Sequence, residues 1–407
     1  MEFRNLTPFS VSRYKMLDKL DHESHVIAMK VGFRLIKAAS GHYQTEIIDK
    51  EPLPLCIQDK YQGKLNDSMV LWESDLAPYK PACDVIINAT AYAPAGKACV
   101  NFTAGVKVSL AEGDALVDKR LLITGERQLV RKLSGTWHFS DPIPFTSLPV
   151  DYRFAFGGEC IIYPKNDKAS KRIPSEYQLT PAQISQHPGQ APFPVAHRVC
   201  TTNPLGTGYS EPWYLHAAQN QTVAAPRIMN ASHPLQVEHF QRLFENHAEL
   251  SAAHYQPAGF GVISRSWQPR LALAGKYDQT WLETRHPYLP DDFDFGYWNC
   301  APKDQQIPFP SSALVLELTN LTPEGTLKVT LPHHQALVLL RMENGLLLPQ
   351  MMQPDTLLID TENMTIAVTW RGLVSTTMPV RIMEARYEME PGRLEDKFLL
   401  HREIAHG

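Results

Sequence analysis

The sequence predicts a mainly β protein with an antiparallel, β-sandwich-like N-terminal module, an irregular middle region with a short helical insertion, and a C-terminal β-meander module. Apolar and polar residues alternate with a period of two in several short segments, and turn-forming residues separate these segments. Of the 407 residues, 32 are prolines, which is about 8% of the chain, whereas proteins average about 5% proline. Because proline interrupts helices, this density favours strands joined by ordered loops.

The length predicts more than one structural region, since a single hydrophobic core seldom organises so long a chain. We place an N-terminal β module at residues 1–155 and an irregular central region, rich in aromatic residues and proline, at 156–306. A C-terminal β module is expected at 307–407. No repeat of fixed period is visible in the sequence, so whether the two β modules are related is left open.

The first region contains the clearest strand patterns. In residues 25–36, one face of the expected strand carries Ile27, Met29, Val31, Phe33 and Leu35. Lys30 and Arg34 fall on the other face, so we expect a half-buried strand. Residues 99–110 alternate over their whole length, and 83–93 also fit a strand. Several short strands at this spacing indicate an antiparallel sandwich or barrel.

The middle region is expected to be irregular except for one amphipathic helix at residues 237–253. Its apolar positions recur at three- and four-residue intervals: Val237, Phe240, Leu243, Phe244 and Leu250. Residues 165–196 hold five prolines and few large apolar residues, which indicates an exposed loop or lid.

Strand patterns return after residue 311. The expected strands cover residues 314–318, 326–331, 336–342, 356–360 and 364–370. The turn Glu343-Asn344-Gly345 contains Asn-Gly, a strong hairpin signal, and a second turn is expected at 361–363. Together these features predict a β-meander.

Composition limits the possible partners and surroundings. The net charge of −4 and the pI of about 6.5 give no reason to expect nucleic acid or an anionic membrane surface. Because the sequence shows neither a signal-peptide core nor an 18-residue apolar run, we expect a cytoplasmic protein. The six cysteines are scattered without a Cys-x-x-Cys pair, which favours free, mostly buried thiols.

Motifs for a metal or cofactor site are weak, and we expect neither. His22 and His25 lack the four-residue spacing that places two imidazoles on one helix face, and His333 and His334 are adjacent. The glycine pairs lack the Gly-Lys-Ser/Thr context of a phosphate-binding loop, and no Gly-x-Ser-x-Gly nucleophile elbow occurs.

A carboxylate cluster leaves one enzymatic alternative open. Asp291, Asp292, Asp294 and Asp304 fall in one region of the sequence, and paired carboxylates can act as general acid and base. A hydrolase using Asp291, Asp294 or Asp304 is therefore an alternative hypothesis. The region also contains Arg270, Arg285 and Lys303, which favour a structural ion-pair network because cations hold carboxylates ionised.

Residues 267–306 carry eight aromatic side chains in forty positions. Tryptophan, tyrosine and arginine dominate protein-binding hot spots, so this segment predicts either an interface or a small aromatic core under loops. The candidate aromatic cluster is Trp267, Tyr277, Trp281, Tyr288, Tyr297 and Trp298.

The same segment resembles the domain of unknown function 2169 family, found in bacteria that carry type VI secretion systems. The residues that carry the resemblance and form the candidate protein-binding set are Trp267, Arg270, Tyr277, Asp278, Trp281, Arg285, Asp292, Asp294, Asp304 and Gln305. Upstream motifs in the same order as in the family include Ser74-Asp75, Lys80-Pro81, Asp84-Val85, Phe156-Gly157-Gly158 and Asn203-Pro204-Leu205-Gly206. His286 departs from the aromatic residue that often follows the arginine in the family.

The resemblance extends from about residue 15 to residue 310 and implies a function that composition does not. It implies an adaptor or chaperone that binds an effector or a spike-tip protein and promotes its loading on the type VI secretion spike. The family has no established catalytic residues to transfer, so we expect a binding protein and not an enzyme. A structural protein exported with the spike remains a third hypothesis. The client, its binding surface and the oligomeric state are left open.

Overall fold

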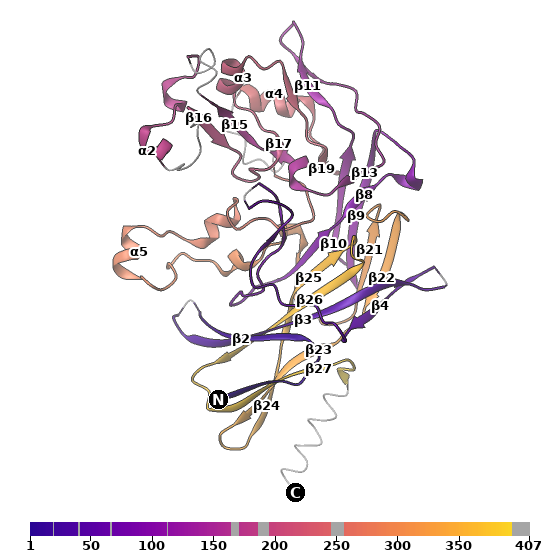
Figure 1. The fold of residues 1–407 in the computed structure, drawn as a ribbon, viewed down its shortest axis with the longest axis vertical. Helices are drawn as coiled ribbons and strands as arrows, with labels where there is room; N and C mark the ends of the chain where they lie inside the picture. The colour runs from indigo at the N-terminus through magenta and orange to yellow at the C-terminus, as the bar shows by residue number, and fades with distance from the viewer. Residues whose placement is uncertain are drawn as a thin grey trace.

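The computed structural model describes residues 1–18, 20–39, 41–65, 67–111, 113–163, 171–185, 195–245 and 256–392. These residues form a mainly β fold, which confirms the predicted class (Figure 1). In Figure 1 the helices α2, α3 and α4 gather at one end of the molecule, and β23, β24 and β27 lie at the other. The helix α5 projects sideways from the body.

Most strands come from the first and last parts of the chain. The N-terminal strands are β1 (Glu2–Asn5), β2 (Ser10–Leu17), β3 (Glu23–Lys37), β4 (Tyr43–Ile48), β5 (Lys60–Tyr61), β6 (Val70–Trp72), β7 (Cys83–Asn88), β8 (Thr90–Tyr92), β9 (Asn101–Leu110), β10 (Ala115–Thr124), β11 (Gln128–Arg131), β12 (Trp137–Phe139) and β13 (Ser147–Pro149). The C-terminal strands are β21 (Leu314–Thr319), β22 (Thr326–Leu331), β23 (Gln335–Met342), β24 (Leu347–Met351), β25 (Gln353–Asp360), β26 (Thr365–Ser375) and β27 (Val380–Glu388).

The middle region is built from shorter elements. Its strands are β14 (Phe156–Gly157), β15 (Glu159–Ile162), β16 (Ala196–Val199), β17 (Thr207–Gly208), β18 (Thr222–Ala224), β19 (Ile228–Asn230) and β20 (Gln306–Ile307). Its α-helices are α2 (Pro181–Ser185), α3 (Pro212–Ala218), α4 (Val237–Glu245) and α5 (Gln279–Thr284). The 3₁₀ helices of the chain include η6 (Arg270–Ala274), η7 (Phe295–Trp298) and η8 (Lys303–Gln305).

Strands from distant parts of the sequence alternate within two large sheets. The larger sheet has the order β2-β3-β26-β25-β7-β20, and β4 also pairs with β3. The second has the order β19-β10-β9-β21-β22. The two C-terminal strands β25 and β26 therefore lie between β3 and β7, so the boundary expected at residue 307 does not separate one sheet from another.

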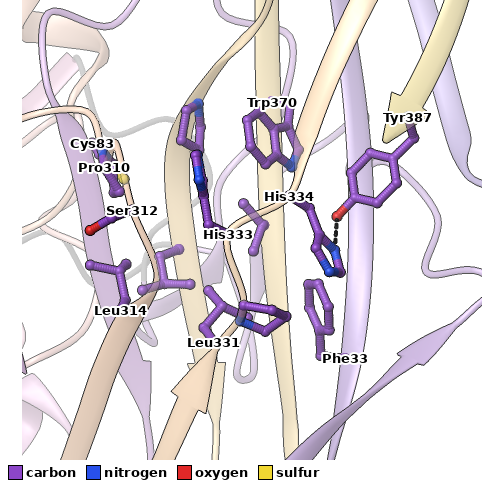
Figure 2. A pocket seen from close by; sticks show the side chains of 14 residues that line it. Phe33, Cys83, Pro310, Ser312, Leu314, Leu331, His333, His334, Trp370 and Tyr387 are labelled. Carbon is purple, nitrogen blue, oxygen red and sulfur yellow. Dashed lines mark hydrogen bonds between the residues drawn. The ribbon is translucent and has the colours of Figure 1, made fainter. Parts of the chain in front are cut away.

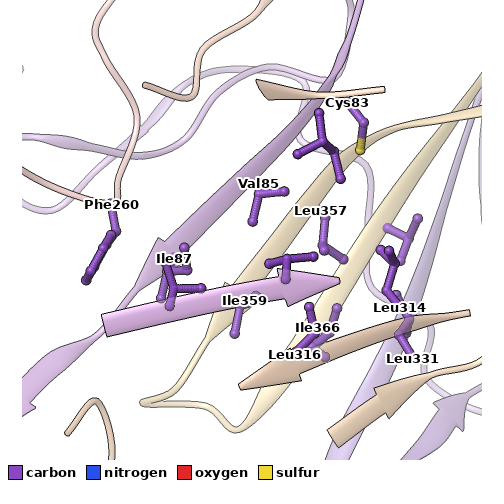
Figure 3. Packing of buried hydrophobic residues seen from close by; sticks show 14 of the residues in the cluster. Cys83, Val85, Ile87, Phe260, Leu314, Leu316, Leu331, Leu357, Ile359 and Ile366 are labelled. Carbon is purple, nitrogen blue, oxygen red and sulfur yellow. The ribbon is translucent and has the colours of Figure 1, made fainter. Parts of the chain in front are cut away.

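The main core lies where these two sheets face each other. Val85, Ile87, Leu357, Ile359 and Ile366 come from the larger sheet, and Leu314, Leu316 and Leu331 come from the second (Figure 3). All of them are buried. Their branched side chains suit a pleated, covered surface, and their burial supplies much of the apolar area removed from water on folding. A separate cluster around Trp213, Phe240 and Phe244 packs under α3 and α4.

Several local predictions are confirmed. The alternating residues 99–110 correspond to β9, and the Asn-Gly turn joins the antiparallel pair β23 and β24. The turn at 361–363 joins β25 and β26. The predicted helix at 237–253 begins at Val237 and is described to Glu245, so the remainder lies outside the described residues. All six cysteines are unpaired, and five of them are buried.

Other local predictions differ from the structure. The short helices α2, α3 and α5 have five to seven residues each, which is too short for a clear apolar period. Within the expected loop at 165–196, residues 165–170 and 186–194 lie outside the described residues, and the described part contains α2. The half-buried strand expected at 25–36 is confirmed at Arg34, which is exposed, but residues 25–33 are buried on both faces, and Lys30 is only 2% exposed. The Lys30 ammonium group lies 2.5 Å from Asp75 Oδ2, and this ion pair allows both faces to be covered there.

We predict that neither residues 1–306 nor residues 307–407 fold alone. The reason is that β25 and β26 complete a sheet whose other strands are β2, β3, β4 and β7 from the N-terminal region and β20 from the middle region. Each fragment should lack the cooperative thermal transition that the full chain shows by circular dichroism. A cooperative β-type transition in the isolated 307–407 fragment would instead support a separate C-terminal module.

Candidate protein-binding arm

The residues predicted to form a binding cluster divide into a projecting arm and a buried base. We define the α5 arm as residues 276–292, which contain α5 and project from the body of the protein (Figure 1). Asp278 caps α5 by accepting a hydrogen bond from the main-chain nitrogen of Trp281 at 3.0 Å. An aspartate in this position satisfies a donor that the first helical turn leaves without a partner.

Trp281 organises the interior of the α5 arm. Its indole nitrogen donates to the main-chain oxygen of Tyr288 at 2.8 Å. Its ring packs edge-on against Tyr277, at 4.8 Å between centroids, and against His286, at 5.2 Å. The arm is therefore held by its own side chains and has a defined shape before any partner binds.

Polar contacts fix both ends of the α5 arm. The Arg285 guanidinium donates to both carboxylate oxygens of Asp21 at 2.8 and 3.0 Å, and it lies 3.1 Å from Asp291 Oδ1. Asp21 belongs to the turn between β2 and β3, so this pair attaches the arm to a distant part of the sheet. Asp292 accepts a hydrogen bond from the main-chain nitrogen of Lys276 at 3.0 Å, which joins the two ends of the arm.

The outer surface of the α5 arm exposes large apolar side chains. Tyr277 is 55% exposed, Leu282 54% and Tyr288 41%. On the β2–β3 turn, beside Asp21, Leu20 is 72% exposed. Single exposed apolar residues are common on proteins, but a group on one ordered projection marks a candidate interaction site.

The base beneath the arm is buried and cannot contact a partner directly. Trp267 is 5% exposed and packs edge-on against Tyr152 at 5.5 Å. Arg270 is 4% exposed and donates to both carboxylate oxygens of Glu73 at 2.6 and 2.7 Å. Arg270 also donates to the main-chain oxygens of residues 263 and 297, so it holds together the loops from which the arm emerges.

Gln305 has a similar structural role. It is fully buried, and its amide nitrogen donates to the main-chain oxygens of Val85 at 2.8 Å and Phe260 at 2.9 Å. Its side-chain oxygen accepts a hydrogen bond from Lys119 Nζ at 2.8 Å. Gln305 thus links the segment after the arm to β7 and β10.

The carboxylates considered for catalysis have separate partners. Asp294 caps η7 by accepting from the main-chain nitrogen of Gly296 at 2.7 Å. Asp304 pairs with Lys119 at 2.8 Å, whereas Asp291 pairs with Arg285. Within the described ranges, no three His, Cys, Asp or Glu side chains are arranged to hold a metal ion. The geometry assigns each of these carboxylates a structural contact.

Sequence reasoning missed a buried ionic layer on the side of the larger sheet that carries the arm's base. We define this layer as four cations and four carboxylates: Lys30, Lys80, Arg270, Arg371, Glu73, Asp75, Asp84 and Asp355. Each of these cations lies within 2.9 Å of one of the carboxylates. Lys30, Asp75, Lys80, Asp84 and Arg270 occur singly in the patterns and motifs of the sequence, but nothing in the sequence indicates that these residues pair with one another.

Asp84 connects the ionic layer to the segment that follows the arm. Its side chain is fully buried and accepts hydrogen bonds from Lys80 Nζ at 2.9 Å and from the main-chain nitrogens of Cys300 and Ala301 at 3.0 and 3.1 Å. Burial opposes ionisation, but the charge of Lys80 and these hydrogen bonds outweigh it and hold the pKa of Asp84 below its usual range. Burial acts to lower the pKa of Lys80, but the charge of Asp84 outweighs burial and raises this pKa.

A small cavity lies between the two large sheets. Its walls include Phe33, Leu331 and Trp370, and Figure 2 shows His334 beside Tyr387, with 2.8 Å between His334 Nδ1 and the Tyr387 hydroxyl. His333 and His334 lie in the connection before β23 and not on a strand. The cavity volume of about 40 Å³ is sufficient for water. It is too small for an organic ligand, because sites for such ligands usually exceed about 300 Å³.

Comparisons with known proteins gave one match. A family model described as an uncharacterized protein conserved in bacteria, DUF2169, matches residues 21–371. Neither the search of curated proteins nor the search of solved structures found a match. Among the described residues, no helix is both long and apolar enough to cross a membrane.

We predict that Asp84→Asn destabilises the protein by about 3–5 kcal/mol at pH 7, because it leaves Lys80 buried without a counter-charge. The pKa of Asp84 is lowered in the folded state, so its contribution to stability is present above the unfolded value of about 3.9. That contribution is lost as the pH falls through the folded-state pKa. Urea unfolding between pH 2 and 7 should therefore show a weaker acid dependence in the variant.

Asp118→Asn provides the control, since Asp118 forms an exposed pair with Arg120 at 3.6 Å. This variant should change the free energy of unfolding by less than about 1 kcal/mol. Equal effects of the two substitutions would contradict the structural role assigned to Asp84.

Proposed function

We propose that this chain, which belongs to the domain of unknown function 2169 family, is an adaptor or chaperone of type VI secretion. In this role it binds an effector or a spike-tip protein in the bacterial cytoplasm and promotes its loading on the secretion spike. The observation that supports the proposal is the α5 arm, an ordered projection with an exposed apolar surface.

The chemistry of the arm suits protein recognition. Tyr277 and Tyr288 offer large, rigid side chains with a polar tip, and such side chains are enriched in binding hot spots. Their positions are set in advance by Trp281 and by the Arg285–Asp21 pair, so less conformational freedom is lost on binding. A partner that covers Leu282 as well would remove apolar surface from water.

The two alternatives receive less support. A hydrolase would need two carboxylates that converge on one substrate, whereas Asp291, Asp294 and Asp304 each contact a different structural partner. An exported spike component would expose a similar arm, so the two hypotheses are distinguished by where the protein is found after the secretion apparatus fires. An adaptor stays in the cytosol after firing, and a spike component appears in the secreted fraction.

We predict that the double variant Tyr277→Ala, Leu282→Ala weakens the complex with the cognate effector or spike-tip protein by at least about 2 kcal/mol, which is roughly a thirtyfold increase in Kd. Both side chains are more than half exposed, so the thermal stability of the free protein should change little. The measurement is isothermal titration with the client obtained by co-expression with the neighbouring genes.

The matched control is Leu133→Ala, which removes a fully exposed leucine at the turn between β11 and β12. This change should leave the affinity unchanged. In cells, a strain that carries the double variant should fail to deliver that one client while the secretion apparatus still fires. Normal delivery together with unchanged affinity would refute the arm as the binding surface, and normal delivery by a deletion strain would refute the adaptor role.

A further inference from the structure

The strand β2 leaves one side of the larger sheet open. It pairs with β3 alone and lies at one end of the strand order (Figure 1). With eight residues, β2 is the longest of the described strands that end a sheet. β24, which ends the four-stranded sheet, is interrupted by Pro349, whereas β2 contains no proline. Among the sheet edges of the described residues, β2 therefore offers the longest continuous one.

The pairing of β2 sets the direction of its main-chain groups. β2 and β3 are antiparallel over the whole length of β2, without a shift of register. The pattern continues into the turn, where the main-chain nitrogen of Asp18 donates to the oxygen of His22 at 3.0 Å. Because this direction alternates along a strand, the main-chain groups of every odd-numbered residue of β2 point away from β3. These residues are Val11, Arg13, Lys15 and Leu17.

The outward main-chain groups of β2 have no partner. Within the part of the chain that the structure describes, the N–H and C=O groups of the four odd-numbered residues make no hydrogen bond. The loop before β5 reaches β2 at its start, where Ser10 Oγ accepts from the main-chain nitrogen of Leu55 at 3.2 Å. A row of alternating donors and acceptors is matched by the main chain of another extended segment, which can pair with it as an added strand.

The side chains beside this row are cationic. Arg13 is exposed, and among the described residues no carboxylate forms an ion pair with it. Lys15 is also exposed and pairs with Glu23 at 2.8 Å. Arg13 and Lys15 are two residues apart, so both side chains lie on the same face of β2. An added strand therefore meets a positively charged edge.

The charges disfavour a second copy of this chain as the added strand. If two β2 strands paired antiparallel through their free sides, odd-numbered residues would lie opposite odd-numbered residues. Each register that pairs at least three of the four positions then places Arg13 opposite Arg13, Arg13 opposite Lys15, or Lys15 opposite Lys15. Like charges directly opposite each other are destabilising, whereas opposite charges stabilise the pair. The edge thus favours an acidic segment.

We propose that the free side of β2 binds an extended, acidic segment of a partner protein as an additional antiparallel strand. Two carboxylates of that segment, two residues apart, lie opposite Arg13 and Lys15. The antiparallel direction follows from the slightly greater stability of antiparallel pairs. This site is separate from the apolar surface of the α5 arm and goes beyond the adaptor proposal. Its test needs no client, so its failure and the failure of the adaptor role are distinguishable.

The test is fluorescence anisotropy of labelled, amidated heptapeptides titrated with the full chain. The acidic peptide is Thr-Val-Glu-Val-Glu-Val-Thr, and a second peptide carries lysine in place of both glutamates. We expect the acidic peptide to bind at least about tenfold more tightly than the lysine peptide, and the difference to shrink as salt is added. Equal affinity for the two peptides, or no binding of the acidic peptide, would overturn the proposal.

Two methylated forms of the acidic peptide test main-chain pairing. In an antiparallel pair opposite Arg13 and Lys15, the two glutamates direct their N–H groups toward β2, whereas the valines direct theirs away. Methylating both glutamate nitrogens should therefore weaken binding at least about tenfold, and methylating two valine nitrogens should weaken it much less. An equal loss with the two methylated peptides would overturn the addition of a strand.

Charge reversal locates the site on β2. Arg13→Glu should weaken the acidic peptide about tenfold and strengthen the lysine peptide. The matched control is Arg381→Glu, which reverses the charge of an exposed arginine on β27, a strand paired on both sides, and should leave both affinities unchanged. Both variants should keep the thermal transition of the parent chain, because both side chains are exposed. An unchanged preference for the acidic peptide in Arg13→Glu would contradict the assignment to β2.

Discussion

Arg371 donates to Asp355 and to the main-chain oxygens of Asp75 and Ala77 from a position with only 5% of its surface exposed. A buried guanidinium group is tolerated only when such acceptors are in place, since an unpaired buried charge costs several kcal/mol. Asp355 comes from β25 and Arg371 from β26, whereas Asp75 and Ala77 come from the loop before β7. The ionic layer therefore requires the N-terminal and C-terminal parts of the chain to assemble together.

The same layer connects the fold to the candidate binding surface. Asp84 binds the main chain at residues 300 and 301, and Arg270 joins Glu73 to the loops that precede and follow the α5 arm. Charge pairs in a shielded interior are directional, because their hydrogen bonds fix both distance and angle. The base of the arm is thus positioned by polar contacts to the sheet, while the apolar side chains of the arm remain available on its outer side.

Local patterns in the sequence identified several of the longer strands but not the order of the strands in the sheets. The alternation in residues 99–110 and the Asn-Gly turn at 344–345 act over a few residues, so they identify β9 and the β23–β24 hairpin correctly. The insertion of β25 and β26 between β3 and β7 depends on pairing across more than 250 residues and leaves no periodic signal. Lys30 was expected on a solvated face for the same reason, since its partner Asp75 lies in a loop.

The sequence predicted the residues of the candidate site but not which of them are exposed. Composition places Trp267, Arg270 and Tyr277 in one aromatic and arginine-rich segment, but only the structure separates the two buried residues from the exposed one. Substituting Arg270 removes both short hydrogen bonds to the buried Glu73 carboxylate and leaves it only Arg265 at 3.5 Å, so a lost interaction with a partner would be inseparable from lost folding. The exposed Tyr277 makes an edge contact with Trp281 but carries no buried charge, and its removal leaves the ionic layer intact. Much of the signature that resembles the family therefore encodes the support of the arm, and under the proposed function the side chains on its outer surface would recognise the client.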